Sequence, residues 1–323
     1  MKVNFISRKG TEHFATPILN YIKNNTNDLI IEKTITKNKL LAVFKSFFYH
    51  KIWVEWASHN AINISSILRA NQKLVIRLHR YEMYNEKYMK KIKWGKVERL
   101  IFVNPELEKI FKKNVNKYVK TVTIPNAIET EKFNYFEPNS KNSLLAYSHS
   151  FHPVKGYDNL LITFAKLINV NPNFSLTIAA KKPKSPIHLK NYNQCKKIIL
   201  NSNLKNKAFI HEIADDSEIL DLLKKHNGII SYSDIESFHY SFAEGLLSGL
   251  QGFCNGWREL NPYNFWNNWC YENEQKFIEG ILLWGKLPIK ERKKISISNR
   301  QYIIENFSSE KIGQEYLNLL SSL

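Results

Sequence analysis

The chain has 323 residues, of which 43% are hydrophobic and 24% charged, as in a soluble globular protein long enough for two domains. No apolar run approaches the roughly 20 residues that a bilayer-spanning helix needs. The amino-terminal stretch MKVNFIS carries one lysine and too short an apolar run for a secretory signal. The three cysteines include no CxxC pair, which argues against a disulfide framework and a thiolate metal site. We therefore expect the chain in the cytoplasm.

The net charge of +18 is unevenly distributed. Residues 1–140 contain 25 Lys and Arg against 12 Asp and Glu, whereas the remainder contains 22 against 17. Such a basic half favours a polyanionic partner, which leaves open a nucleic acid, an anionic membrane surface or a phosphorylated substrate. The alternative is that this charge has no binding role and only keeps the protein soluble.

Short apolar strands alternate with helical patterns, which predicts parallel sheets covered by helices. In the first half we expect a helix over 12–23 and strands over 3–7, 29–33, 52–56, 74–79, 100–104 and 122–125. Residues 126–142 break the rhythm with Pro, Asn and Ser, and we interpret them as a linker.

A second series begins after the linker. Its expected elements are strands over 144–150, 174–180, 207–213 and 228–233, with helices over 156–169, 187–200 and 217–226. Ser308 or Ser309 is expected to cap the last helix.

The predicted fold class is α/β, with two Rossmann-like doubly wound domains that face each other across a cleft. We expect an N-terminal domain over 1–138, a C-terminal domain over 139–306, and a terminal helix over 307–323 that packs back on the first domain. A ligand is expected at the carboxyl ends of the strands.

The stretch ESFHYSFAE runs from Glu236 to Glu244, directly after the strand predicted over 228–233. The two glutamates straddle a strand-to-helix turn, with Glu236 on the loop and Glu244 in the helix. A helix N-terminus attracts phosphate, and a neighbouring carboxylate accepts hydrogen bonds from sugar hydroxyls. Alternatively, both glutamates are ordinary solvated residues.

Two other stretches support the first interpretation. SFHPVKGYDNLL (150–161) places a lysine and a glycine at the start of a helix after a strand, and IPNAIETEKF (124–133) precedes it. Together with the glutamate pair they resemble the retaining nucleotide-sugar glycosyltransferases of family 4, whose two Rossmann-like domains form the GT-B fold. The resemblance covers most of the chain and is strongest over 120–250.

This resemblance implies roles for individual residues. Lys155 would hold the donor diphosphate, Glu236 would lie close to the donor sugar, and Glu244 would bind the ribose hydroxyls. The segment facing the phosphates and sugar would be Ser237, Phe238, His239 and Tyr240. In the first domain Gly10 and Thr11 would approach the donor, and His79 would contact the sugar. The catalytic set is therefore His79, Lys155 and Glu236, with no metal and no cofactor.

The sequence also departs from the family pattern. Ser150 occupies the place of an arginine that pairs with the lysine, and His149 or His152 would supply part of the missing donor set. Arg258 is another candidate for the lost charge. His239 replaces a glycine, and its side chain would shape the sugar pocket.

Metal binding is not expected. The acidic cluster ADDSE (214–218) is better explained as a helix start capped by Asp or Ser, and His149 and His152 lack the spacing of a zinc site.

Residues 37–53 interleave lysines with Phe44, Phe47, Phe48, Tyr49 and Trp53. As a helix this stretch would suit an anionic membrane surface. The competing explanation is packing against the sheet of the first domain, which we expect for at least half of these aromatics. A second basic and aromatic stretch covers 88–96.

The resemblance thus implies a retaining glycosyltransferase that moves a sugar from a UDP- or GDP-type donor to a saccharide or lipid-linked acceptor. The Lys- and Asn-rich composition favours bacterial surface polysaccharide assembly, in the cytoplasm or peripherally on the inner face of the cell membrane. Two alternatives remain: a nucleotide-sugar-binding relative with weak or no catalysis, and a basic nucleic-acid-binding protein. We expect no nucleic-acid partner, because no binding motif is recognisable.

Overall fold

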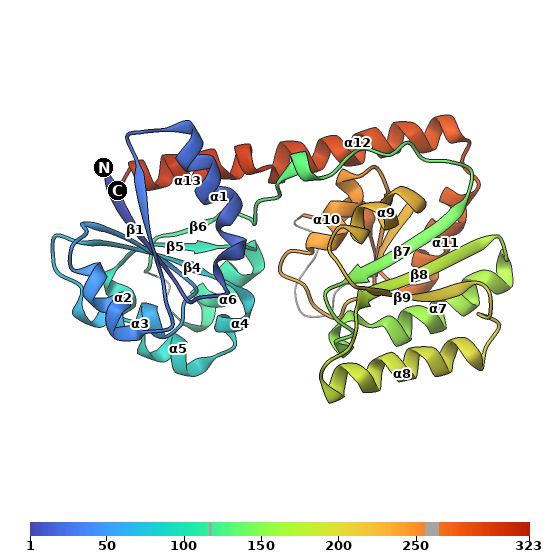
Figure 1. Ribbon diagram of the computed structural model, residues 1–323, viewed down its shortest axis with the longest axis horizontal. Coiled ribbons are helices and arrows are strands. Elements are labelled where there is room, and N and C mark those ends of the chain that lie inside the picture. Colours follow the sequence, from blue (N-terminus) through green and yellow to red (C-terminus); the bar gives the residue numbers. More distant parts are fainter. Residues whose placement is uncertain (116–117, 256–264) are drawn as a thin grey trace. The chain divides into compact units, whose positions relative to one another are not determined.

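The computed structural model describes residues 1–115, 118–255 and 265–323, which form two compact units (Figure 1). Unit 1 comprises Met1–Glu129 and Asn306–Leu323, and unit 2 comprises Thr130–Glu305. Each unit is a parallel sheet with helices on both faces (Figure 1).

The first boundary falls between Glu129 and Thr130, whereas the sequence placed it after residue 138. Residues 130–138 are held by unit 2. The Phe136 amide donates to the Ser248 carbonyl oxygen at 3.0 Å, and other hydrogen bonds of this segment go to the same unit.

The described part of unit 1 forms a six-stranded parallel sheet in the order β2-β1-β3-β4-β5-β6. Its strands are β1 (Lys2–Ser7), β2 (Ile30–Ile35), β3 (Lys51–Glu55), β4 (Lys73–Leu78), β5 (Val97–Phe102) and β6 (Thr121–Thr123). Its helices are α1 (Thr16–Asn25), α2 (Lys39–Ser46), α3 (His59–Ile67), α4 (Arg80–Met83), α5 (Glu86–Lys91), α6 (Pro105–Asn114) and α13 (Ser309–Ser321). The strands β1, β3 and β4 are largely buried, as expected for the centre of a sheet covered on both faces, whereas the edge strands β2 and β6 are not.

The described part of unit 2 forms a second six-stranded parallel sheet in the order β12-β11-β10-β7-β8-β9. Its strands are β7 (Asn142–Ser148), β8 (Phe174–Lys181), β9 (Ala208–Ile213), β10 (Gly228–Ser231), β11 (Gln251–Asn255) and β12 (Cys270–Tyr271). Its helices are α7 (Tyr157–Val170), α8 (Pro186–Leu200), α9 (Glu218–Lys225), α10 (Tyr240–Leu247), α11 (Glu274–Gly285) and α12 (Ile289–Phe307), the last of which ends in unit 1. The two predicted doubly wound domains are thus confirmed.

In each sheet the strand order reverses at one point. This point lies between β1 and β3 in unit 1 and between β7 and β10 in unit 2. In open parallel sheets the loops at the carboxyl ends of such neighbouring strands diverge, and ligands bind in the crevice between them.

The termini of several helices follow from local chemistry. The helix predicted over 12–23 is instead a 3-10 turn over Glu12–Phe14 followed by α1, with a proline in its first turn. Ser308 caps α13, since its hydroxyl accepts from the Lys311 amide at 3.2 Å.

The last helix packs within unit 1. α13 contacts α1, and the buried Tyr316 stacks on Trp53 of β3 with 5.0 Å between ring centroids.

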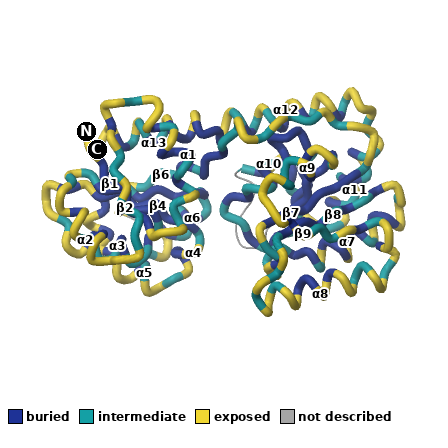
Figure 2. The backbone as a smooth tube through the Cα atoms, viewed as in Figure 1, coloured by how far each residue is buried: buried dark blue, intermediate teal, exposed yellow. Residues whose placement is uncertain are grey.

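The stretch over 37–53 differs from the expectation that at least half of its aromatics pack inward. It forms the short helix α2 and the start of β3. Trp53 is fully buried, but Phe44, Phe47 and Phe48 are exposed. Figure 2 colours much of the α2 backbone as exposed. The inward face of α2 carries the small residues Ala42 and Ser46 instead. Within the described ranges, no helix has both the length and the apolar character to cross a bilayer.

Candidate functional site

The site in unit 2 is organised around Gly156, which precedes α7. Its φ of +61° is left-handed, and a Cβ built on it would lie 2.2 Å from the Tyr232 carbonyl oxygen, so only glycine fits. A hydrogen bond holds these two segments together: the Asp234 amide donates to the Val154 carbonyl oxygen at 2.8 Å. The glycine of the Lys-Gly pair therefore brings the loop after β7 against the loop after β10.

Lys155 and Glu236 form an ion pair at this contact. Nζ of Lys155 donates to Oε1 of Glu236 at 2.5 Å, and Ser233 Oγ donates to the same oxygen at 3.0 Å. The two side chains are only 22% and 14% exposed. Burial raises the pKa of Glu236, but the opposing interactions are stronger and keep this pKa below its usual value. Glu236 is therefore ionised at neutral pH.

His239 caps the amino terminus of α10. Its Nδ1 accepts from the Phe242 amide at 3.4 Å, which leaves the ring proton on Nε2, 3.8 Å from Oε1 of Glu236. Burial lowers the pKa of His239 to about 4, so the ring is neutral at pH 7. His239 and Lys155 both act to lower the pKa of Glu236, and Lys155 is the partner that donates to its carboxylate directly. Where the family has glycine, this chain has a capping imidazole beside the glutamate.

Glu244 lies in α10 and is partly buried. Its Oε2 accepts from the hydroxyl of Tyr147, near the end of β7. Burial raises the pKa of Glu244 to about 7, even though the Tyr147 hydrogen bond lowers it. Neither Glu236 nor Glu244 is thus a freely solvated carboxylate, and their environments move their pKa values in opposite directions.

The rest of the predicted segment is placed as follows. Phe238 is buried and its ring lies 5.6 Å from that of Trp266, while Ser237 precedes it on the loop and Tyr240 begins α10. The side chain of Phe238 therefore belongs to the core beneath the loop.

Ser150, at the position where the resemblance implies an arginine, lies at the end of a chain of hydrogen-bonded hydroxyls. The Tyr157 hydroxyl donates to Ser148 Oγ, which donates to the carbonyl oxygen of Ser150, both at 2.8 Å. His152 is exposed, and its Nδ1 accepts from the Val154 amide at 3.1 Å. Arg258 lies outside the residues that the structure describes.

A second group of predicted residues lies in unit 1. Gly10 has a φ of +91°, and its amide donates to Oε2 of Glu12 at 2.6 Å. Nε1 of Trp56 donates to the carbonyl oxygen of Thr11 at 3.0 Å, and the indole stacks on the imidazole of His79 at 4.0 Å between centroids. Trp56 itself has a φ of +76°, an uncommon conformation for a large side chain. The structure therefore brings Thr11 and His79 together through Trp56, at the strand reversal of unit 1.

His79 is buried directly after β4. Its Nε2 lies 2.7 Å from Oε1 of Glu55, and the same oxygen accepts from the Arg77 guanidinium at 3.0 Å. Glu55 and Arg77 are both fully buried. Burial lowers the pKa of His79, while Glu55 acts to raise it. The imidazole is therefore neutral, with its orientation set by the Glu55 carboxylate.

Four residues of these two groups were absent from the sequence prediction: Ser233, Tyr147, Glu55 and Trp56. Glu55 could have been identified from the sequence, because a glutamate inside an apolar strand needs a buried partner. Tyr147 and Ser233 had only their positions near strand ends. Lys155, Glu236, His239 and Glu244 lie in unit 2, whereas Gly10, Thr11 and His79 lie in unit 1.

Among the described residues no cluster of three His, Cys, Asp or Glu side chains is arranged to hold a metal ion. The acidic cluster 214–218 starts α9, and Oε1 of Glu218 accepts from the amides of Ala214 and Asp215. Ser217 occupies the N-cap without a capping hydrogen bond from its side chain. The helix start was therefore predicted correctly, and Asp215 Oδ1 accepts from the Ser217 amide at 2.8 Å directly before it.

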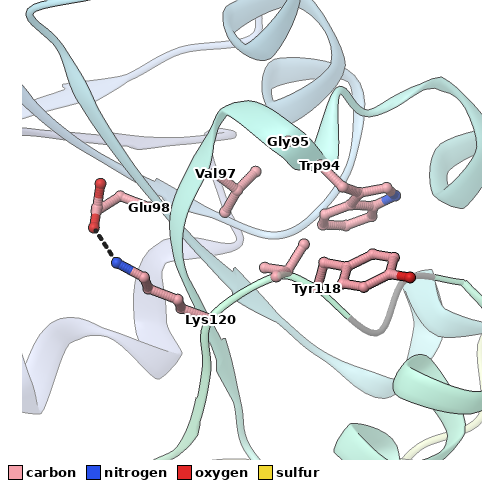
Figure 3. Close-up of a pocket in the computed structure, with 7 residues that line it drawn as sticks. Trp94, Gly95, Val97, Glu98, Tyr118 and Lys120 are labelled. Atoms are coloured by element: carbon pink, nitrogen blue, oxygen red, sulfur yellow. Dashed lines mark ion pairs between the residues drawn. The ribbon is translucent and has the colours of Figure 1, made fainter.

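Unit 1 also contains a cavity of about 250 Å³ at the amino ends of β5 and β6 (Figure 3). It is lined by Trp94, Gly95, Val97, Glu98, Tyr118, Val119 and Lys120. Glu98 and Lys120 form an ion pair at 3.6 Å beside it. The cavity lies at the opposite end of the strands from Thr11 and His79.

No family model and no curated protein matches the sequence, but solved structures match its fold. A glycosyltransferase from Rickettsia africae has a TM-score of 0.72 at 17% identity, covering 99% of this chain and 98% of its own. Anabaena HepE, solved in complex with UDP and glucose, has a TM-score of 0.74 at 15% identity with full coverage of both chains. Sucrose-phosphate synthase from Thermosynechococcus elongatus has a TM-score of 0.73 at 14% identity, again with full coverage. The chain therefore has the two-domain GT-B fold of these glycosyltransferases.

Proposed function

We propose that the protein is a retaining glycosyltransferase of the family 4 type, which transfers a sugar from a nucleotide diphosphate donor. The observation that carries this proposal is the Lys155–Glu236 pair at the strand reversal of unit 2, where Gly156 brings the two loops together. The likeness to HepE, which was solved with UDP and glucose, supports a UDP-type donor, with GDP as the alternative.

In this proposal Lys155 exchanges partners when the donor binds. Its ammonium group leaves Oε1 of Glu236 and contacts the diphosphate, whose charge grows as the sugar departs. Glu236 accepts hydrogen bonds from sugar hydroxyls, while Ser233 continues to hold one of its oxygens. Because the charges are already in place before the reaction, the site needs little reorganisation.

Glu244 and Tyr147 would hold the ribose. The carboxylate accepts from the ribose hydroxyls once it is ionised, and the Tyr147 hydroxyl orients it. Ser237, Phe238, His239 and Tyr240 line the phosphates and sugar through their backbone. Ser150, Gly10 and Thr11 complete the donor set.

His79 contacts the donor sugar as a neutral imidazole whose orientation is set by Glu55. Attack by the acceptor comes from the face that the nucleotide leaves, with a donor phosphate oxygen taking the acceptor proton. No protein nucleophile and no metal ion takes part in this scheme. The acceptor is a saccharide or a lipid-linked saccharide of bacterial surface polysaccharide assembly, which would bring the enzyme to the inner face of the membrane.

The first test is a thermal-shift panel with UDP, GDP, CDP and ADP. We expect one nucleotide to raise the Tm of the wild-type protein and to leave that of Glu244→Ala unchanged. Glu212→Ala is the matched control, because Glu212 also accepts a hydrogen bond from a tyrosine in unit 2, Tyr192, and is not one of the proposed donor-binding residues. That variant should keep the shift.

The absence of a shift with every nucleotide, in folded protein, would contradict the donor site. A shift without turnover of any matching sugar donor would instead favour the binding-only relative. That second candidate is supported by Ser150, which stands where the family has an arginine.

A further inference from the structure

Helix α2 exposes its large apolar side chains and buries its small ones. The exposed set, which we name the α2 ridge, consists of Leu40, Leu41, Phe44, Phe47 and Phe48. Their spacing places them on one stripe of the helix and its carboxyl-terminal turn. Phe44 and Phe48 are 57% and 67% exposed, and their rings contact each other at 5.1 Å between centroids. Apart from the Phe44–Phe48 contact and the Arg69 guanidinium 5.6 Å from the Phe47 ring, the α2 ridge is left exposed, and an exposed apolar stripe of this kind marks an interaction surface.

Cations gather beside the α2 ridge. The set that we name the basic rim consists of Arg8, Lys39, Lys87 and Lys91, which come from the loop after β1, from α2 and from α5. All four act on His59 at the start of α3: burial lowers the pKa of His59, and these charges lower it further. They are exposed, and none forms an ion pair with another described residue.

The ridge and the rim belong to one surface. α2 packs on α3, and α3 contacts α5, so the three helices lie together on one side of unit 1 (Figure 1). Lys39 of the basic rim adjoins the α2 ridge, because it begins α2 one residue before Leu40. The nearby acid Glu32 is already engaged by Lys2, at 2.9 Å, and by the Tyr49 hydroxyl.

We propose that the α2 ridge and the basic rim dock the protein on an anionic bilayer surface. Phenylalanine and leucine side chains enter the boundary between headgroups and acyl chains, while lysine and arginine contact anionic headgroups. A symmetric contact with a second copy would bring two basic rims together, and their repulsion disfavours it. The membrane contact itself is argued from the surface of unit 1. Only its purpose, which is to bring the enzyme to a lipid-linked acceptor, rests on the proposed function.

The test is sedimentation of the full chain with vesicles of phosphatidylcholine, alone or mixed with phosphatidylglycerol. The apolar variant is Phe44→Ser with Phe48→Ser, and the charge variant is Lys39→Glu with Lys87→Glu. The matched control is Leu200→Ser with Leu283→Ser, which removes two apolar side chains that are similarly exposed in unit 2. All changes are at the surface, and circular dichroism verifies that each variant folds.

We expect the wild type and the control to bind mixed vesicles at least about tenfold better than neutral ones, and both α2-surface variants to lose most of that binding. Equal binding to both vesicles, no binding by the wild type, or an equal loss in the control would overturn the proposal. The proposal would also be overturned if the wild type formed a dimer and did not bind vesicles, and if Phe44→Ser with Phe48→Ser converted that dimer to a monomer. The α2 ridge would then be a contact between two copies of the chain. The nucleotide-induced Tm shift is measured on the same variants, so that a failure of docking is distinguished from a failure of the donor site.

Discussion

Lys155 Nζ lies 2.5 Å from Oε1 of Glu236, although 81 positions separate the two residues in the chain. The pair exists because Gly156 lets the loop after β7 touch the loop after β10. The lysine is thus held at the strand reversal, where its charge is balanced by a carboxylate. This relationship leads to the first two predictions.

Replacing Lys155 with Met should abolish the nucleotide-induced Tm shift and lower the free energy of unfolding by about 1–3 kcal/mol, because Glu236 is left partly buried without its cation. Lys155→Met combined with Glu236→Gln should recover stability without recovering nucleotide binding. The control is Lys166→Met, whose pair with Glu274 is more exposed and should contribute at most about 1 kcal/mol. Urea denaturation measures all three, and equal losses for Lys155→Met and Lys166→Met would contradict the argument.

Gly156→Ala should destabilise unit 2 by about 2–4 kcal/mol, because it adds both left-handed strain and a clash with Tyr232. Gly10→Ala adds strain alone, since its Cβ would meet no atom within 4 Å, and should cost about 1 kcal/mol. Gly95→Ala adds neither and should stay within about 0.5 kcal/mol of wild type. Thermal and urea denaturation rank the three variants by their loss of stability. A Gly156→Ala variant as stable as the wild type would refute the prediction.

The buried Glu55 should be more important for stability than any surface carboxylate. Glu55→Gln leaves the buried Arg77 without its counter-charge, so we expect a loss of about 3–5 kcal/mol in the free energy of unfolding. The pKa of His79 should fall further, because Glu55 acts to raise it. The control Glu98→Gln, whose partner Lys73 is at the surface, should lose no more than about 1 kcal/mol. Denaturation measures the loss in the free energy of unfolding, and NMR titration measures the pKa of His79. An unchanged pKa of His79 would refute the proposal that Glu55 orients this imidazole.

The stability of unit 2 should fall as the pH rises from about 4.5 to about 7 through the titration of Glu244. Burial raises its pKa from 4.5 to about 7, so over this interval the folded chain keeps a proton that the unfolded chain has lost. Glu244→Gln removes the group, and the decrease in stability between pH 5 and pH 8 should shrink by about 1–3 kcal/mol. Urea denaturation at both pH values tests this, with Glu212→Gln as the control. An unchanged difference in Glu244→Gln would show that the carboxyl titrates normally.

The sequence by itself determined the two doubly wound halves, because alternating apolar strands and helices leave few other ways to bury their apolar faces. It also singled out Lys155, Gly156, Glu236 and Glu244 and correctly predicted the strand-to-helix turn between the glutamates, since glycine, charge and position after a strand are local signals. Ser308 as a helix cap was predictable for the same reason.

Only the tertiary structure decided which residues meet. The contacts of Tyr147 with Glu244 and of Glu55 with His79 join separate strands and helices, and no local pattern encodes which strands become neighbours in a sheet. The outward orientation of Phe44 and Phe48 was equally hidden. An apolar stripe predicts that a helix face is buried, but whether the chain itself covers that face depends on which side packs on the sheet, and in α2 the small face does.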